Sequence, residues 1–202
     1  MIVIDIETTG PDLAVDGIIG VGAAVGNASN CELHSWWTYA PPHRRWWRDE
    51  LQQPHVQARH KKPFREVWDS EIWPLIRNES AHIAFYGANR VIPFIHAELG
   101  REEIDPATVL DPTVWIQASD RLFRSFDLTE ACEHLQVELP RYHQPAAKVR
   151  AEMTWDVIRK MRSMGWFREH DIHTPSGWMA TLERQAKARE LIAARNAERG
   201  AP

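Results

Sequence analysis

The residues best suited to chemistry are two carboxylates near the start of the chain. Asp5 and Glu7 lie at the end of an apolar, β-branched run that begins at Met1. If this run forms a strand, its period of two places both carboxylates on one side. Because like charges held this close repel, such a pair needs a cation, and divalent ions with oxygen ligands supply it in phosphoryl-transfer nucleases. Other segments of the chain must then provide one or two further acids.

The order of several motifs resembles the DEDDh 3′-5′ exonucleases, a ribonuclease-H-like family that includes polymerase proofreading subunits. Residues 4–10, Ile-Asp-Ile-Glu-Thr-Thr-Gly, resemble the first motif. Residues 84–95 resemble the second motif, and the stretch from His143 to Lys148 with the helix after it resembles the third, His-x-x-x-x-Asp. Between them, residues 109–112 and 128–134 resemble the family's strand with a following Asp and its Cys-containing helix. The resemblance covers residues 1–165.

The resemblance implies a role for each matching residue. Asp5 and Glu7 would be the catalytic metal ligands, and His143 would be what remains of the general base. Mg²⁺ or Mn²⁺ would be the cofactor if the protein is active. Thr8 and Gly10 would contact nucleic acid.

Two of the four acids of the family are missing. The acid of the second motif falls on Val91, and the acid of the third motif falls on Lys148. A lysine ammonium can neutralise Asp5 or Glu7 in the space that a metal would occupy, so we expect an ion pair there and weak metal binding. Glu152, one helical turn after Lys148, is the alternative, a relocated metal ligand.

A basic, tryptophan-rich segment interrupts the pattern between residues 40 and 63. It contains Arg44, Arg45 and Arg48 around Trp46 and Trp47. These residues could contact single-stranded DNA or RNA, with arginines on phosphates and tryptophans stacked on bases. A solvated loop and a protein interface are the two alternatives.

Composition limits the possible partners. The 202 residues carry a net charge of −4, which excludes a globally basic coat for nucleic acid. The two cysteines form no Cys-x-x-Cys motif, so we expect a reducing compartment and a cytoplasmic location. No run of apolar residues is long enough to span a membrane.

The predicted fold class is α/β: a ribonuclease-H-like, five-stranded mixed sheet with flanking helices and a C-terminal helical extension. Residues 1–165 would form the exonuclease-like domain and residues 166–202 the extension. The expected strands are 1–6, 17–25, 32–39, 80–86 and 108–111. The expected helices are 65–77, 90–99 (with Pro93 in the first turn), 125–135, 144–161 and 176–199.

Three functions therefore stay open. The first is an exonuclease-like nucleic-acid-binding protein that cleaves weakly or not at all. The second is an active, metal-dependent 3′-5′ exonuclease that uses Glu152. The third is a protein-interaction module on an inactive exonuclease fold.

Overall fold

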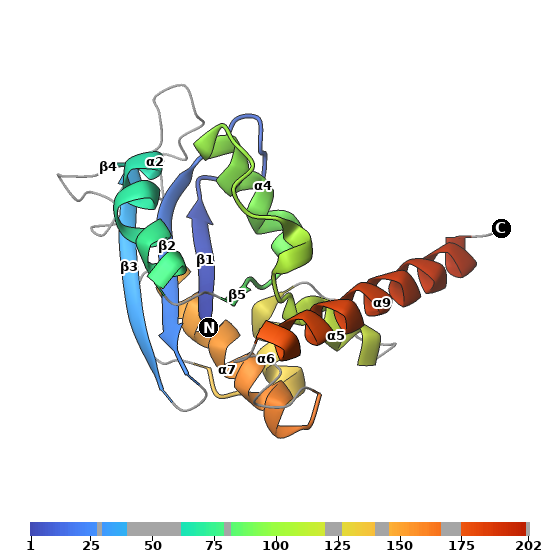
Figure 1. Ribbon diagram of the computed structural model, residues 1–202. Helices are drawn as coiled ribbons and strands as arrows, with labels where there is room; N and C mark the ends of the chain where they lie inside the picture. Colours follow the sequence, from blue (N-terminus) through green and yellow to red (C-terminus); the bar gives the residue numbers. More distant parts are fainter. Residues whose placement is uncertain are drawn as a thin grey trace.

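A five-stranded mixed sheet forms the centre of the protein in the computed structural model, as the sequence predicts. The structure describes residues 1–27, 30–39, 62–78, 82–119, 127–139, 146–166 and 175–200. The sheet order is β4-β3-β2-β1-β5, with β1–β2 and β2–β3 antiparallel and β1–β5 and β3–β4 parallel (Figure 1). The strands are β1 (Ile2–Thr8), β2 (Ile18–Gly26), β3 (Cys31–Tyr39), β4 (Lys62–Pro63) and β5 (Ile83–Ala84).

The fifth strand is not the one expected. The prediction of a strand at residues 108–111 was wrong, because only Leu110 pairs there, through a single parallel bridge to Ala84. The 3-10 turn η2 (Pro106–Thr108) precedes this point and helix α5 (Pro112–Ser119) follows it closely, so no longer strand can form. The short strand β4 instead completes the sheet beside β3.

Helices cover both faces of the sheet. One face carries α2 (Phe64–Val67), the π-helix η1 (Trp68–Ile72), α3 (Trp73–Asn78) and α4 (Ala88–Leu99). The other face carries α6 (Leu128–Leu135) and α7 (Ala146–Ser163), together with parts of α5 and of α9 (Pro175–Gly200) (Figure 1). Because it is covered on both sides, β1 is fully buried at Ile2, Val3 and Ile4.

Two prolines change the predicted helices. The single helix expected at 65–77 contains a π-turn, in which the Trp73 N–H donates to the Trp68 carbonyl. Pro74 follows directly and has no N–H to continue the α-helical pattern. Pro93 is the sixth residue of α4 rather than part of its first turn, so the Asn89 carbonyl loses its helical donor.

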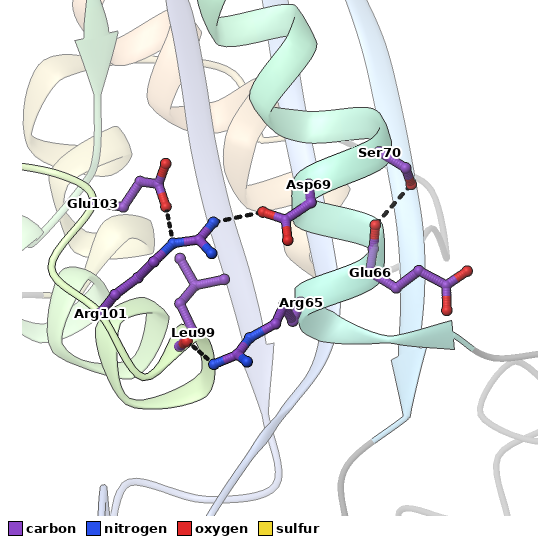
Figure 2. A network of polar contacts seen from close by, with 7 residues as sticks. All are labelled: Arg65, Glu66, Asp69, Ser70, Leu99, Arg101 and Glu103. Atoms are coloured by element: carbon purple, nitrogen blue, oxygen red, sulfur yellow. Dashed lines mark hydrogen bonds and ion pairs between the residues drawn. The ribbon is translucent and has the colours of Figure 1, made fainter.

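Side chains from two helical segments fix the end of α4. The Arg65 guanidinium donates to the Leu99 carbonyl at the C-terminus of α4 (Figure 2). Arg101, just after that helix, contacts Glu103 and also donates to Asp69 of η1 over 2.6 Å. These contacts hold α4 against the α2–η1 segment, which matters because the other end of α4 lines the cleft described below.

Helix α9 is partly built into the core. Gln185 is buried, and its side-chain amide bonds to the backbone on either side of Leu110: Nε2 donates to the Val109 carbonyl and Oε1 accepts from the Asp111 N–H, both over 2.8 Å. Trp178 is buried too and stacks on His82. The second half of α9 extends away from the body (Figure 1). The division into a domain of residues 1–165 and an extension of residues 166–202 stays a prediction.

None of the described helices combines the length and the apolar composition that crossing a bilayer requires.

A glycine on β2 sets the position of α7. A Cβ atom added to Gly22 would lie 2.2 Å from the Ala147 carbonyl oxygen and 2.4 Å from the Lys148 nitrogen. The first turn of α7 therefore packs directly on the backbone of β2. Only glycine permits so close an approach, because any other residue would place a Cβ atom between the two backbones. In this way Gly22 determines which α7 side chains reach β1.

We predict that Gly22→Ala lowers the free energy of unfolding by about 2 kcal/mol or more, because the added methyl group displaces α7. Gly20→Ala is the matched control: it lies on the same strand and face, and its Cβ would meet its nearest neighbours at an ordinary 3.4 Å. Urea unfolding measures both variants. Equal destabilisation by the two would contradict the close packing at Gly22.

Candidate active site

Asp5 and Glu7 project from the same face of β1, as the sequence predicts. Their cross-strand partners on β2 are Gly22 and Gly20, which have no side chains to cover them. Asp5 is almost completely buried, whereas Glu7 is partly exposed. This is also the face against which α7 packs.

An arginine of α7 pairs with Asp5. The Arg150 Nε lies 3.1 Å from Oδ2 and 3.2 Å from Oδ1 of Asp5. We predicted this ion pair for Lys148, and that assignment was wrong: among the described residues, Lys148 forms no ion pair with Asp5 or Glu7. Two residues correspond to about 200° around an α-helix, so positions 148 and 150 leave α7 on opposite sides.

The burial of Asp5 disfavours the ionised form of its carboxyl group. Burial raises the pKa of Asp5 from 3.8 to about 6, although Arg150 acts to lower it. The positive charge therefore offsets only part of the cost of removing this carboxylate from water. The Arg150 side chain remains 45% exposed.

A cleft of about 550 Å³ opens beside this pair. Its walls come from β1, the loop after β1, the first turns of α4, and Arg150 of α7. We call it the cleft and define it by its lining residues, which are Asp5, Ile6, Glu7, Thr8, Gly10, Pro11, Leu13, Tyr86, Gly87, Asn89, Arg90, Val91, Pro93, Phe94 and Arg150.

The loop after β1 is organised by a buried carboxylate. Asp16 accepts from the Thr9 hydroxyl over 2.9 Å and from the Asp12 N–H over 2.8 Å. A Cβ at Gly10 would lie 2.5 Å from the Asp16 carboxylate, so the glycine leaves room for it. The Thr8 hydroxyl donates to the Gly10 carbonyl over 2.8 Å. The Thr-Thr-Gly sequence thus shapes the wall of the cleft that contains Thr8 and Gly10.

A second buried carboxylate positions α4. Asp111 accepts from the backbone N–H groups of Gly87 and Ala88, over 3.1 and 2.9 Å, at the start of this helix. Burial raises the pKa of Asp111, while these hydrogen bonds and those from Thr113 act to lower it. Since Gln185 of α9 holds the Asp111 backbone, α9 helps to place the residues of α4 that line the cleft.

Of the remaining candidates, Glu152 is described by the structure and does not join Asp5 and Glu7 in the cleft. Glu152 lies outside the cleft lining; its charge and that of Asp156 act on Cys31, whose pKa is raised mainly by burial. Cys31 begins β3 and pairs with Gly26, at the end of the sheet remote from Glu7. His143, Arg44, Arg45, Arg48, Trp46 and Trp47 lie outside the described residues.

The described residues of the cleft do not fit a pair of divalent ions. Asp5 and Glu7 are the only acids among the described residues that line it, and Val91 occupies part of the wall where the resemblance requires a carboxylate. Asp5 is already paired with a cation. Within the described part of the chain, no three His, Cys, Asp or Glu side chains come close enough together to hold a metal.

Comparisons with known proteins identify the fold. No family model matches the sequence, and no curated protein is significantly similar to it. A solved structure of a full-length 3′-exonuclease is 14% identical, with a TM-score of 0.62 over 81% of each chain. The chain has a ribonuclease H-like fold.

Two further structures agree with this fold. Exonuclease X, solved with duplex DNA that carries a 5′ overhang, is 15% identical with a TM-score of 0.54, covering 85% of this chain and 96% of its own. The RNase domain of yeast Pop2 is 11% identical with a TM-score of 0.54, covering 87% and 80%. At such identities the likeness concerns the fold alone.

The sequence analysis missed Arg150, Arg90 and Asp16. Helical periodicity could have indicated Arg150, since Ala147 and Ala151 are the small residues that pack on the sheet and residue 150 lies on their flank. No local signal marks Arg90 or Asp16, because only the fold places Arg90 at the cleft and Asp16 beside Thr9 and Asp12.

We predict that Arg150→Met destabilises the protein in a pH-dependent way. Without the guanidinium, the ionised Asp5 is buried beside no cation, which costs about 1–2 kcal/mol at pH 8 after allowing for solvent screening. Near pH 4.5, below the folded pKa of about 6, Asp5 is protonated in both proteins and the difference vanishes.

Urea unfolding of Arg150→Met and of the natural protein at the two pH values measures the difference in the free energy of unfolding. Arg159→Met is the control, because Arg159 lies on the same helix in an exposed pair with Asp156. A loss of stability that is equal at both pH values would show that Arg150 contributes through packing and not through its charge on Asp5.

Proposed function

We propose that this protein binds single-stranded nucleic acid in the cleft of a DEDDh-type exonuclease fold and cleaves it weakly or not at all. The observation that carries the proposal is the Arg150–Asp5 ion pair, with Nε and Oδ2 separated by 3.1 Å. The guanidinium takes the place beside Asp5 that a divalent ion would need. The second missing acid, at Val91, leaves an apolar side chain in the opposite wall.

The chemistry of the cleft supports a nucleic-acid ligand. Arg90 and Arg150 offer donors to phosphate oxygens, while Leu13 and Phe94 offer apolar and aromatic surface to a base. A volume of about 550 Å³ suits one terminal nucleotide better than a duplex. Exonuclease X, which shares the fold, was solved in complex with DNA.

The position of Arg150 also bears on the proposed base. The motif His-x-x-x-x-Asp separates base and acid by five positions, whereas His143 precedes Arg150 by seven. His143 is therefore in register with Lys148, not with the residue that contacts Asp5. We assign His143 no part in nucleic-acid binding, because binding activates no water and needs no general base.

The experiment restores the acids. In the presence of Mn²⁺, we expect the natural protein to bind labelled single-stranded oligonucleotides without degrading them. Val91→Asp/Arg150→Asp supplies four carboxylates around one cleft and should gain Mn²⁺ binding by calorimetry together with measurable degradation. The matched control is Val91→Asp/Lys148→Asp. It also introduces two aspartates, but the one at position 148 lies on the side of α7 that faces away from Asp5.

Each result distinguishes the alternatives. Rapid degradation by the natural protein, abolished by Glu152→Gln, would replace the proposal with the active exonuclease that uses a relocated ligand. Failure of the natural protein to bind any single-stranded DNA or RNA would leave the protein-interaction module. Equal gain of metal binding by the two double variants would contradict the role given to Arg150.

A further inference from the structure

Arg150 contacts Asp5 with only one of its three nitrogen atoms. Nε makes both contacts to the carboxylate, at 3.1 and 3.2 Å. Within the described residues, Nη1 and Nη2 have no hydrogen-bond acceptor, and the side chain is 45% exposed where it lines the cleft. The two Nη atoms therefore present the flat, forked edge of a guanidinium, a geometry that matches two oxygens of a phosphate.

A second guanidinium, from helix α4, lines the same cleft. Arg90 lies in the first turn of α4, is exposed, and forms no ion pair with any other described residue. Its helix is held in place by Asp111 at one end and by Arg65 at the other. Arg90 thus stands on a fixed element and has its charge available to a ligand.

The charges of the cleft balance without a metal ion. Among the described lining residues, Asp5 and Glu7 carry two negative charges, and Arg90 and Arg150 carry two positive charges. The carboxylate side can accept hydrogen bonds from sugar hydroxyls, and the arginine side can donate to an anion. A terminal phosphate monoester carries about −1.5 to −2 charges and three oxygens, so it gains more from two guanidiniums than a phosphodiester with one charge.

We propose that the cleft recognises the phosphorylated end of a single-stranded nucleic acid, with Arg150 Nη1 and Nη2 and the Arg90 guanidinium binding the terminal phosphate. This inference rests on the proposed function, because it names the ligand of the same cleft. It differs from the metal-dependent use of such a cleft, since the phosphate is held by side chains alone. Binding should therefore be insensitive to EDTA.

The experiment compares ends of otherwise identical oligonucleotides. Fluorescence anisotropy in EDTA measures the affinity of short oligothymidylates with a 3′-hydroxyl, a 3′-phosphate or a 5′-phosphate, with the dye on the other end. We expect one phosphorylated end to bind about tenfold more tightly than the hydroxyl end, from one additional charge-assisted contact. The arm that shows the preference identifies which end enters the cleft.

Variants link the preference to the two arginines. Arg90→Ala should remove most of the preference, and Arg150→Lys, which keeps the charge but loses the fork, should reduce it while Asp5 remains paired. Arg159→Ala, an exposed charge deletion on α7 outside the cleft, should leave it unchanged. Circular dichroism of each variant confirms that it is folded.

The outcomes separate this inference from the proposed function. If hydroxyl and phosphate ends bind equally well, and Arg90→Ala binds both as the natural protein does, the inference is overturned and nucleic-acid binding stands. If no oligonucleotide binds, the proposed function fails and the inference fails with it. A preference that appears only when Mn²⁺ is added would also overturn it, because a metal would then hold the phosphate.

Discussion

The cleft depends on how closely α7 approaches the sheet. At Gly22 the helix backbone lies where a side chain would otherwise stand, and this contact brings Arg150 within 3.1 Å of Asp5. The ion pair follows from the packing: a carboxylate buried between two strands and a helix needs a counter-charge, and the helix supplies one. Burial still raises the pKa of Asp5 to about 6 although Arg150 acts to lower it, and the partly exposed Arg150 side chain lines the cleft.

Two buried carboxylates that do not line the cleft determine the shape of its walls. Asp16 holds the loop that contains Gly10, and Asp111 holds the start of α4. Gln185 of α9 fixes the Asp111 backbone in turn, so the C-terminal helix contributes to the site although it does not line the cleft. A fold of this kind can keep the walls of a cleft while the residues that line it change.

The sequence was sufficient to predict the features that depend on local residue patterns, but not those that depend on how the helices pack on the sheet. The β-branched run of β1 and its period of two were sufficient to predict the strand and the shared face of Asp5 and Glu7. The order of strands and helices along the chain, together with the resemblance to the exonuclease family, indicated the fold class. Motif spacing pointed to Lys148 in place of Arg150, because it does not say which side of the helix faces Asp5. The period of the small residues Ala147 and Ala151, which pack on the sheet, was the sequence signal for that side. The strand β4 and the π-turn at Trp68 were missed because they are short. A segment of two to five residues shows no hydrophobic period from which its structure could be predicted.

The central claim is that a guanidinium occupies the position beside Asp5 where the fold could otherwise hold a metal ion. A crystal of the natural protein soaked in Mn²⁺, examined by anomalous diffraction at the manganese edge, tests it most directly. The account predicts no peak beside β1, with Arg150 Nε still in contact with both oxygens of Asp5. Two well-occupied manganese peaks between Asp5 and Glu7, with Arg150 displaced toward solvent, would contradict it.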